Sequence, residues 1–273
     1  MTASDPAIDP SGHRIRRLLA QGPVVVLSGA GLSTASGIPD YRDRNGEWKH
    51  PRPVQHADFL RSENTRKRYW ARSFVGWPTI GLANPSRGHH VLTRFEQLGH
   101  ISTVVTQNVD GLHQKAGSRS VIELHGGLAR VRCLSCQRTA SRTSIQDWMM
   151  DANPGFAPKA APVAPDGDAG VSDALHATFR IPACPACGGM LKPDVVFFGD
   201  SVPKDRVRTC IEAIDAANGL LVVGSSLMVY SGFRLAEYAH RQGKPVMAIN
   251  LGKTRADEFL DAKIEADCDE FLQ

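Results

Sequence analysis

The chain contains 273 residues, and its 32 basic and 28 acidic side chains give a formal net charge of +4. This length suits one large domain, or one domain with a smaller insertion, at roughly 100 to 200 residues per domain. The sequence has neither a block of like charges nor an apolar run near the ~20 residues of a membrane span, so we expect neither a nucleic-acid nor a membrane partner. It also lacks the basic and apolar start of a signal peptide, so we expect a soluble protein of the bacterial cytoplasm.

The first predicted elements are a capped helix over residues 11–19 and a buried strand over residues 24–27. The strand leads into Gly29-Ala30-Gly31, as a strand leads into the phosphate-binding turn of a dinucleotide fold. The third glycine of that fingerprint is missing, because Thr34 occupies its position. An NAD dehydrogenase would also need an acidic residue about 20 residues later, at the end of a second strand. Lys49 stands near that position in a segment without strand character, so hydride transfer is disfavoured.

Apolar, β-branched runs recur along the chain at residues 24–27, 101–106, 121–124, 195–198, 220–223 and 246–250. Such runs are typical of strands buried on both faces of a parallel sheet, and helical stretches over residues 207–217 and 233–241 would pack on it. We therefore predict an α/β fold with a Rossmann-like parallel sheet. Residues 46–85 and 131–190 do not fit this plan, and we interpret them as a helical insertion and a zinc-ribbon insertion that together form a smaller lobe. The predicted Rossmann-like, NAD-binding domain then comprises residues 1–45, 86–130 and 191–273.

A polar segment, Thr106-Gln107-Asn108-Val109-Asp110-Gly111, directly follows one of these strands. Ligands of an open α/β sheet bind beyond the carboxyl ends of its strands, so Asn108 and Asp110 could hydrogen-bond a ribose or a carboxamide. The same side chains could instead cap a turn by accepting hydrogen bonds from helix N–H groups. His125 closes the next strand before two glycines, where it could act as a general base. A purely structural role for His125 is the alternative, and His113, close to Asp110, is a competing candidate for the base.

Four of the six cysteines form two C-x2-C pairs, Cys133 with Cys136 and Cys184 with Cys187. In a chain without a secretion signal such pairs favour a metal over disulfides, and four thiolates can surround one zinc ion. A catalytic zinc would leave one position open for water, so four cysteines favour a closed, structural site. The spacer between the pairs is longer than that of an ordinary zinc ribbon because it contains a proline-rich loop, residues 153–170. A loop of this length is equally consistent with a function and with disorder.

Several motifs occur in one order along the chain: Gly29-Ala30-Gly31-x-Ser33-x-x-Ser36-Gly37-Ile38-Pro39-Asp40-Tyr41-Arg42, Thr106-Gln107-Asn108-Val109-Asp110, Leu124-His125-Gly126, the four cysteines, Lys192-Pro193-x-Val195-Val196-x-Phe198-Gly199 and Gly224-Ser225-Ser226. In sequence and order they resemble the sirtuin family, over residues 13 to about 270. The amino-acid sequence of residues 68–77, 164–168 and 221–227 further resembles the class II branch of that family, typified by the fourth human sirtuin.

The resemblance implies that the protein consumes NAD as a co-substrate. The residues expected to contact NAD are Gly29, Ala30, Gly31, Ser33, Ile38, Pro39, Asp40, Tyr41, Arg42, Gln107, Asn108, Val109, Asp110, Gly224, Ser225, Ser226, Asn250, Leu251, Gly252 and Cys268. By the same resemblance, the catalytic residues are His125, Asn108 and Asp110. Gln107 and Asn108 would hold the nicotinamide ribose and Asp110 the carboxamide, and residues 38–42 would close over that ribose as a movable flap. After nicotinamide departs, the acyl-lysine oxygen attacks the ribose C1′, and His125 acts as general base on a ribose hydroxyl.

The resemblance also places the protein substrate. Val195, Val196, Phe197, Phe198 and Gly199 would form an edge along which the substrate peptide adds as a strand. Tyr69 and Arg72 lie three residues apart in a helical stretch, and in sirtuins that remove acidic acyl groups such a pair reads the distal carboxylate. The alternatives are a partly exposed helix pair without that role, or an acyl channel shaped by the loop over residues 154–168.

We therefore expect an NAD-dependent protein-lysine deacylase that acts on acetyl, long or acidic acyl groups and releases nicotinamide and O-acyl-ADP-ribose. We expect it to be a monomer with acyl-lysine proteins as partners and one structural Zn²⁺ per chain. One alternative is mono-ADP-ribosyl transfer from the same NAD site, and the presence of His125 favours the deacylase over it. The other is a non-catalytic NAD sensor or zinc-ribbon binding module, for which no basic nucleic-acid patch is present.

Overall fold

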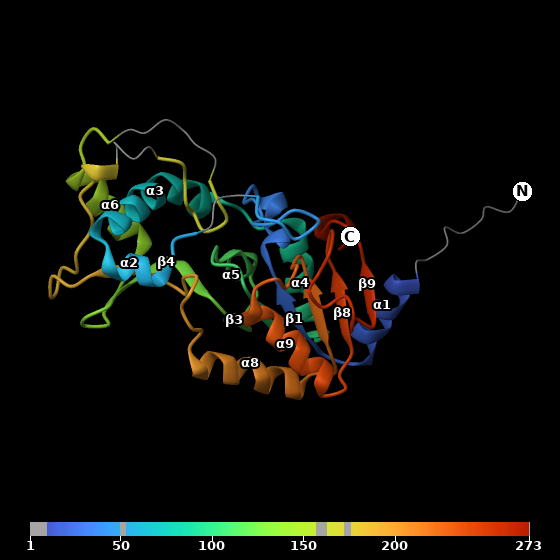
Figure 1. Ribbon diagram of the computed structural model, residues 1–273. Coiled ribbons are helices and arrows are strands. Elements are labelled where there is room, and N and C mark those ends of the chain that lie inside the picture. Colours follow the sequence, from blue (N-terminus) through green and yellow to red (C-terminus); the bar gives the residue numbers. More distant parts are fainter. Residues whose placement is uncertain (1–9, 50–52, 157–162, 172–175, 273) are drawn as a thin grey trace, which may run out of the picture.

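A computed structural model describes residues 10–49, 53–156, 163–171 and 176–272 of the chain, which form two lobes (Figure 1). The larger lobe is built on a six-stranded sheet with the order β3-β2-β1-β7-β8-β9, in which all neighbours run parallel. Its strands are β1 (Val24–Ser28), β2 (Ile101–Thr106), β3 (Val121–Glu123), β7 (Leu220–Val223), β8 (Val246–Ile249) and β9 (Ala262–Ile264). This is the strand order of a doubly wound nucleotide-binding sheet, so the predicted Rossmann-like fold is confirmed.

Helices cover both faces of this sheet. They are α1 (Pro10–Gln21), α4 (Arg87–Gln97), α5 (Leu112–Ala116), α8 (Lys204–Ala216), α9 (Tyr230–Arg241) and α10 (Cys268–Phe271). Val24 and Val26 of β1 pack in one buried cluster with residues of α1 and α4, whereas Val25 and Leu27 pack in a second cluster with residues of α8 and α9. Because successive side chains of a strand point to opposite faces, a strand covered on both sides must be apolar at every position.

The prediction that residues 195–198 form a strand of the parallel sheet is wrong. Strand β6 (Leu191–Val195) pairs antiparallel with β4 (Gly126–Cys133), which also pairs with β5 (Thr139–Ser141) in a separate three-stranded sheet. An apolar run reports burial and not the sheet in which it is buried, so composition could not separate the two. The sixth parallel strand is β9, whose three residues include Lys263 and therefore give no apolar run.

The smaller lobe packs α2 (His56–Arg61), α3 (Glu63–Leu82) and α6 (Arg142–Ala152) around the three-stranded sheet. Its core includes Phe59 and Trp70, which are buried against strand residues such as Val131. The described part of the proline-rich loop lies against α3, and a Cβ at Gly76 would lie 2.1 Å from the Gly167 carbonyl oxygen. Residues 157–162 of that loop lie outside the described residues. The predicted domain limits stay a prediction, and β4 crosses the limit placed at residue 130.

His125 lies at the junction of the two lobes, between the last residue of β3, Glu123, and the first residue of β4, Gly126. Gly126 has φ +80°, and a Cβ at this position would lie 2.0 Å from the Asp194 carbonyl oxygen of β6. Only glycine fits such a close approach, so the backbone that carries His125 is fixed against the smaller sheet.

Within the described ranges, we find no helix with the length and apolar character needed to span a bilayer.

Candidate active site

A cavity of about 700 Å³ opens beyond the carboxyl ends of β1, β2, β7 and β8, on the side that faces the smaller lobe. Doubly wound sheets bind ligands at this edge, where the strand order reverses between β1 and β7. Predicted residues that line it are Gly29, Ala30, Gly31, Ser33, Ile38, Asp40, Tyr41, Arg42, Tyr69, Gln107, Asn108, Val109, Asp110, His125, Val195, Val196, Phe197, Phe198, Gly199, Gly224, Ser225, Ser226, Asn250, Leu251 and Cys268. Pro39, Arg72 and Gly252, which are also predicted, are not among its lining residues.

The Gly29-Ala30-Gly31 turn is shaped by a close approach between the ends of β1 and β7, and it continues into two short 3₁₀ helices, Ala30–Leu32 and Thr34–Ser36. The Gly31 N–H donates to the Gly224 carbonyl at 2.9 Å. A Cβ on Gly29 would lie 2.8 Å from the Gly224 carbonyl oxygen, and a Cβ on Gly31 would lie 3.0 Å from it. Packing of the two strand ends therefore explains both glycines. Their predicted contact with a pyrophosphate stays a prediction.

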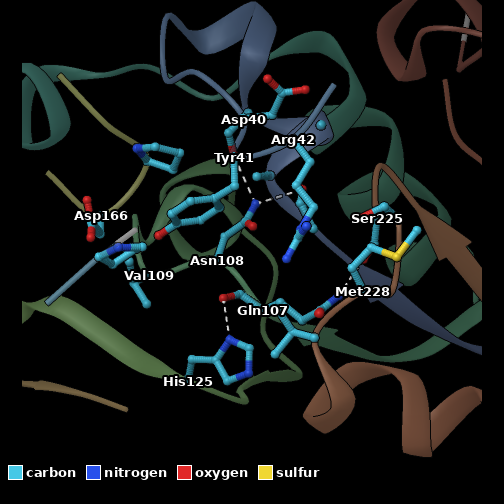
Figure 2. Close-up of a pocket in the computed structure, with 18 of the residues that line it drawn as sticks. Asp40, Tyr41, Arg42, Gln107, Asn108, Val109, His125, Asp166, Ser225 and Met228 are labelled. Atoms are coloured by element: carbon cyan, nitrogen blue, oxygen red, sulfur yellow. Dashed lines mark hydrogen bonds between the residues drawn. The ribbon is translucent and has the colours of Figure 1, made fainter. Parts of the chain in front are cut away.

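The polar segment after β2 is hydrogen-bonded to this turn (Figure 2). Asn108 Nδ2 donates to the Gly29 carbonyl at 3.0 Å and to Ser33 Oγ at 3.1 Å. The Ser33 hydroxyl donates to Asp110 Oδ2 at 2.8 Å, and Asp110 Oδ1 accepts from the Leu112 N–H at 2.9 Å. Asp110 thus accepts from the first N–H of α5, as the turn-capping alternative expects, and Asn108 links the loops that follow β1 and β2. The predicted ligand contacts of both residues stay predictions. Burial raises the pKa of Asp110, and its two hydrogen bonds oppose that shift.

His125 has both ring nitrogens in hydrogen bonds. Its Nδ1 lies 2.9 Å from the Gln107 carbonyl oxygen, as the dashed line in Figure 2 marks. Because a carbonyl oxygen can only accept, Nδ1 carries the proton and Nε2 of the neutral ring has the lone pair. Burial lowers the pKa of His125 to about 4, and the charges of Arg206 and Arg234 act in the same direction. The ring is therefore neutral at pH 7, which is the state that a general base requires.

His113, the competing candidate, is not among the lining residues of the cavity and is only 1% exposed. Its Nε2 lies 2.8 Å from the Ser28 hydroxyl, which donates to Thr106 Oγ1 at 2.9 Å. Burial lowers the pKa of His113 to about 3, so it is neutral as well. The geometry therefore favours His125 as the base and leaves His113 buried on α5, against Ser28 at the end of β1.

Sequence reasoning missed three cavity residues on the first turns of α9, Tyr230, Ser231 and Arg234. Ser231 Oγ lies 2.7 Å from His125 Nε2. Arg234 Nε is buried and has no hydrogen-bond partner within the described part of the chain. The predicted helix begins at Phe233, three residues after the true start at Tyr230, because serine and Gly232 are poor helix formers. The sequence carried no signal that these positions face the base.

The segment over residues 38–49 covers part of the cavity next to Asn108 (Figure 2). The Arg42 guanidinium lies 4.0 Å from the ring centroid of Trp48, a cation–π contact. Tyr41 packs edge-on against Trp48 and Phe198, with centroid separations of 6.1 and 6.2 Å. These aromatic contacts join the predicted flap to the segment expected to bind the substrate peptide.

The far end of the cavity is formed by residues that follow β7 and β8 and by the start of α10. Ser225 Oγ accepts a hydrogen bond from Gln107 Nε2 at 2.8 Å, which links this end to the polar segment after β2. Asn250 Nδ2 donates to the Gly252 carbonyl at 3.1 Å. Burial raises the pKa of the Cys268 thiol to about 12, so this cavity-lining side chain is uncharged at pH 7.

The four paired cysteines meet at one point of the smaller lobe. Cys133 Sγ lies 3.6 Å from Cys187 Sγ, Cys136 Sγ lies 3.7 Å from Cys184 Sγ, and all four sulfurs lie within 4.8 Å of one another. Zn–S bonds of about 2.3 Å give a tetrahedron with edges of about 3.8 Å, so this spacing fits a structural zinc ion. The Cys136 N–H donates to Cys133 Sγ and lowers the pKa of that thiol, whereas the neighbouring thiols raise the pKa of Cys187.

Comparison with known proteins identifies the family. The family model described as "Sir2 family" matches residues 29–231. The chain belongs to the Sir2 family. An "NAD-dependent protein deacetylase" of Xanthomonas campestris pv. campestris is 51% identical over 272 residues, covering 100% of this chain and 91% of the relative. An "NAD-dependent protein deacetylase 2" of Bradyrhizobium diazoefficiens is 51% identical over 247 residues, 90% of each chain.

Solved structures of the Sir2 family align with the whole fold. A structure described as "Sir2-p53 peptide-NAD+" aligns with a TM-score of 0.75 at 30% identity, covering 95% of this chain and 94% of the other. Another, described as "Sir2 bound to acetylated peptide", aligns with a TM-score of 0.76 at 29% identity and the same coverage. The two-lobed arrangement of this chain is therefore that of the Sir2 family.

The segment that Sir2 resemblance assigns to the substrate peptide runs from β6 across the junction of the lobes. The Val196 N–H donates to the His125 carbonyl at 2.8 Å, and the Phe198 carbonyl accepts from the His56 N–H at 2.9 Å. The backbone of residues 196–198 thereby spans from the base to the start of α2. It lines the cavity, as an edge for a substrate strand must.

Tyr69 and Arg72 of this Sir2-family chain differ in their surroundings. Tyr69 lines the cavity and is 4% exposed, whereas Arg72 points to the proline-rich loop. Arg72 Nε lies 2.6 Å from Asp168 Oδ1 and donates to the Ala169 carbonyl at 2.9 Å. Burial raises the pKa of Asp168 to about 7, and the Arg72 charge opposes that shift. The predicted role of Arg72 as a carboxylate reader stays a prediction, and it would require this pair to open.

Proposed function

We propose that the protein is an NAD-dependent protein-lysine deacylase that releases nicotinamide and O-acyl-ADP-ribose. One observation carries this proposal: a neutral histidine, His125, faces the cavity beside the polar segment Gln107–Asp110. Sir2-family relatives that cover nearly the whole chain are named NAD-dependent protein deacetylases. From the resemblance of its motifs, we also propose that the chain belongs to the class II branch and acts as a monomer in the bacterial cytoplasm.

NAD is a substrate of this reaction, and its glycosidic carbon is the electrophile from which nicotinamide departs. The chain would hold the pyrophosphate at the Gly29-Ala30-Gly31 turn, whose backbone N–H groups favour negative charge. Asn108 would hold the nicotinamide ribose and Asp110 the carboxamide. His125 would take a proton from a ribose hydroxyl, a contribution of about 10²- to 10⁴-fold for general bases. Cys268 and Asn250 would lie at the adenosine end.

The protein substrate would add as a strand beside residues 195–199 and place its acyl-lysine toward Tyr69. Two alternatives for the part of the cavity around Tyr69 predict different acyl preferences. If Arg72 exchanges Asp168 for the substrate, acidic acyl groups are preferred. If the Arg72–Asp168 pair stays closed, the loop over residues 154–168 shapes a chamber for neutral groups.

The test is to incubate the purified protein with NAD and lysine peptides that carry acetyl, lipoyl, succinyl, glutaryl or hydroxymethylglutaryl groups, and to follow O-acyl-ADP-ribose by mass spectrometry. We expect an adduct with at least one acyl group and a loss of about 10²-fold or more in His125→Ala. Nicotinamide release without an adduct would favour mono-ADP-ribosyl transfer. Binding of NAD without its consumption would favour the sensor, and His125→Ala with unchanged deacylation would refute the assigned base.

A further inference from the structure

The single lone pair of the neutral His125 ring is already directed at a side chain of the protein. Because Nδ1 carries its proton toward the Gln107 carbonyl, Nε2 must accept, and the group 2.7 Å from it is the Ser231 hydroxyl. Ser231 therefore donates its proton to Nε2. A ribose hydroxyl that approaches the cavity meets a base whose lone pair is occupied.

The position of Ser231 is fixed by the same residue that orients the base. A Cβ on Gly232 would lie 2.3 Å from Gln107 Oε1, so the first turn of α9 packs directly against the Gln107 side chain. The Gln107 backbone carbonyl in turn holds His125. Gln107 therefore contacts both His125 and the helical turn that carries Ser231. The contact between Ser231 and His125 thus depends on Gln107, whose side chain packs against Gly232 and whose backbone carbonyl accepts from His125.

We propose that Ser231 is a catalytic residue that relays the proton from the ribose hydroxyl of NAD to His125. The step rests on the proposed deacylase function. The acyl carbon belongs to the cationic imidate that forms when the acyl-lysine oxygen bonds to the ribose C1′. As the ribose oxygen bonds to this carbon, the C=N π pair of the imidate moves to the lysine nitrogen, the ribose oxygen loses its proton to Ser231 Oγ, and the original Ser231 proton moves to His125 Nε2. One O–H bond of the ribose and one of Ser231 break, while a new O–H on Ser231 and an N–H on His125 form. Charge and protons balance without any further reactant.

A serine hydroxyl is suited to this role because it can donate one hydrogen bond and accept two. In the described structure it donates to Nε2, and its lone pairs are available on a residue that lines the cavity. Direct attack on the proton by His125 would first require Ser231 to leave Nε2. The relay needs no such rearrangement, since each proton moves along an existing or newly made hydrogen bond.

The test compares Ser231→Ala and Ser231→Thr with a matched control, Ser144→Ala, which removes a hydroxyl from the first turn of α6. Two reactions are measured with NAD and an acetyl-lysine peptide: deacylation, and exchange of labelled nicotinamide into NAD, which reports bond cleavage before the base acts. We expect Ser231→Ala to lower deacylation kcat about 10- to 100-fold, within the range of proton-transfer catalysis, and to leave exchange within about twofold. Ser231→Thr should recover deacylation to within about threefold of the wild type, because it keeps the hydroxyl.

The solvent isotope effect adds a readout that a structural role would not move. With two protons in flight, the deacylation rate of the wild type should depend non-linearly on the deuterium fraction, and that of Ser231→Ala should become linear. Equal losses of exchange and deacylation in Ser231→Ala, or no loss in either, would overturn the relay. Absence of both reactions in the wild type would instead refute the proposed function itself, so the two failures are distinguishable.

Discussion

A buried histidine, His113, makes the free energy of unfolding of this protein depend on pH. Burial lowers the pKa of His113 to about 3, whereas an unfolded histidine titrates near 6.5. Between these values the unfolded chain binds more protons than the folded one, so the free energy of unfolding falls as the pH falls from about 6.5. The contribution of neutral, buried His113 to the free energy of unfolding is fully present above about pH 6.5. It is lost as the pH falls toward the folded pKa of about 3.

The change His113→Gln should isolate this effect, because glutamine can hydrogen-bond Ser28 from a similar position but does not titrate. We expect the difference in free energy of unfolding between wild type and variant to change by about 1.4 kcal/mol per pH unit between about pH 6 and 4. Urea denaturation at several pH values measures it. His240→Gln, at an exposed position, is the control for the loss of a histidine side chain. Parallel profiles for wild type and His113→Gln would contradict the assignment.

Helix α3 and the proline-rich loop pack directly against each other. Ala stabilises the interior of a free helix by about 1 kcal/mol relative to Gly. At Gly76 a Cβ would lie 2.1 Å from the Gly167 carbonyl oxygen, a backbone atom, so the loop must move. We expect Gly76→Ala to lower the free energy of unfolding by about 1–3 kcal/mol, the usual cost of overpacking. Because Pro165 and Asp166 of the loop line the cavity, activity on long acyl groups should change more than activity on acetyl.

The same helix supplies the control for this experiment. At Gly81 the atom nearest to an added Cβ would be Trp77 Cε2 at 3.3 Å, which belongs to a side chain that can adjust. Gly81→Ala should therefore be neutral or stabilising by up to about 1 kcal/mol. Urea midpoints and acyl-group preferences of both variants are compared. Equal behaviour of Gly76→Ala and Gly81→Ala would mean that the loop does not rest on α3 in solution.

Elements differ in how far the sequence predicts them. The strands buried on both faces, such as residues 24–27, are predicted because burial demands an apolar residue at each position. Strand β9 is short and contains Lys263, so no apolar run reveals it. The run at 195–198 is apolar for another reason, since it lies between the lobes. The site follows the same logic: His125 is found from its neighbours in sequence, whereas the approach of Ser231 depends on tertiary packing that no local pattern encodes.

In the whole molecule, the zinc site and the active site lie at opposite ends of one sheet ladder. Strand β4 pairs Cys133 with Leu191 of β6 at one end, and Gly126 with Val195 at the other. Gly126 follows His125, and Val196 donates to the His125 carbonyl. The smaller sheet therefore connects the four cysteines to His125 and to the predicted substrate edge, although none of the four cysteines lines the cavity.

Removal of zinc should consequently abolish deacylation while NAD binding persists. We expect a strong chelator, or Cys136→Ser, to increase hydrogen exchange in residues 126–133 and 191–195 and to abolish deacylation, because the thiolates hold the ends of these strands together. NAD binding should persist, since the strand ends that shape most of its site belong to the parallel sheet. Metal analysis, hydrogen exchange and NAD titration measure the three effects, and restored zinc should reverse them in the wild type. Zinc loss with unchanged exchange in β4 would show instead that the hydrophobic core around Phe59 and Trp70 suffices to order the lobe.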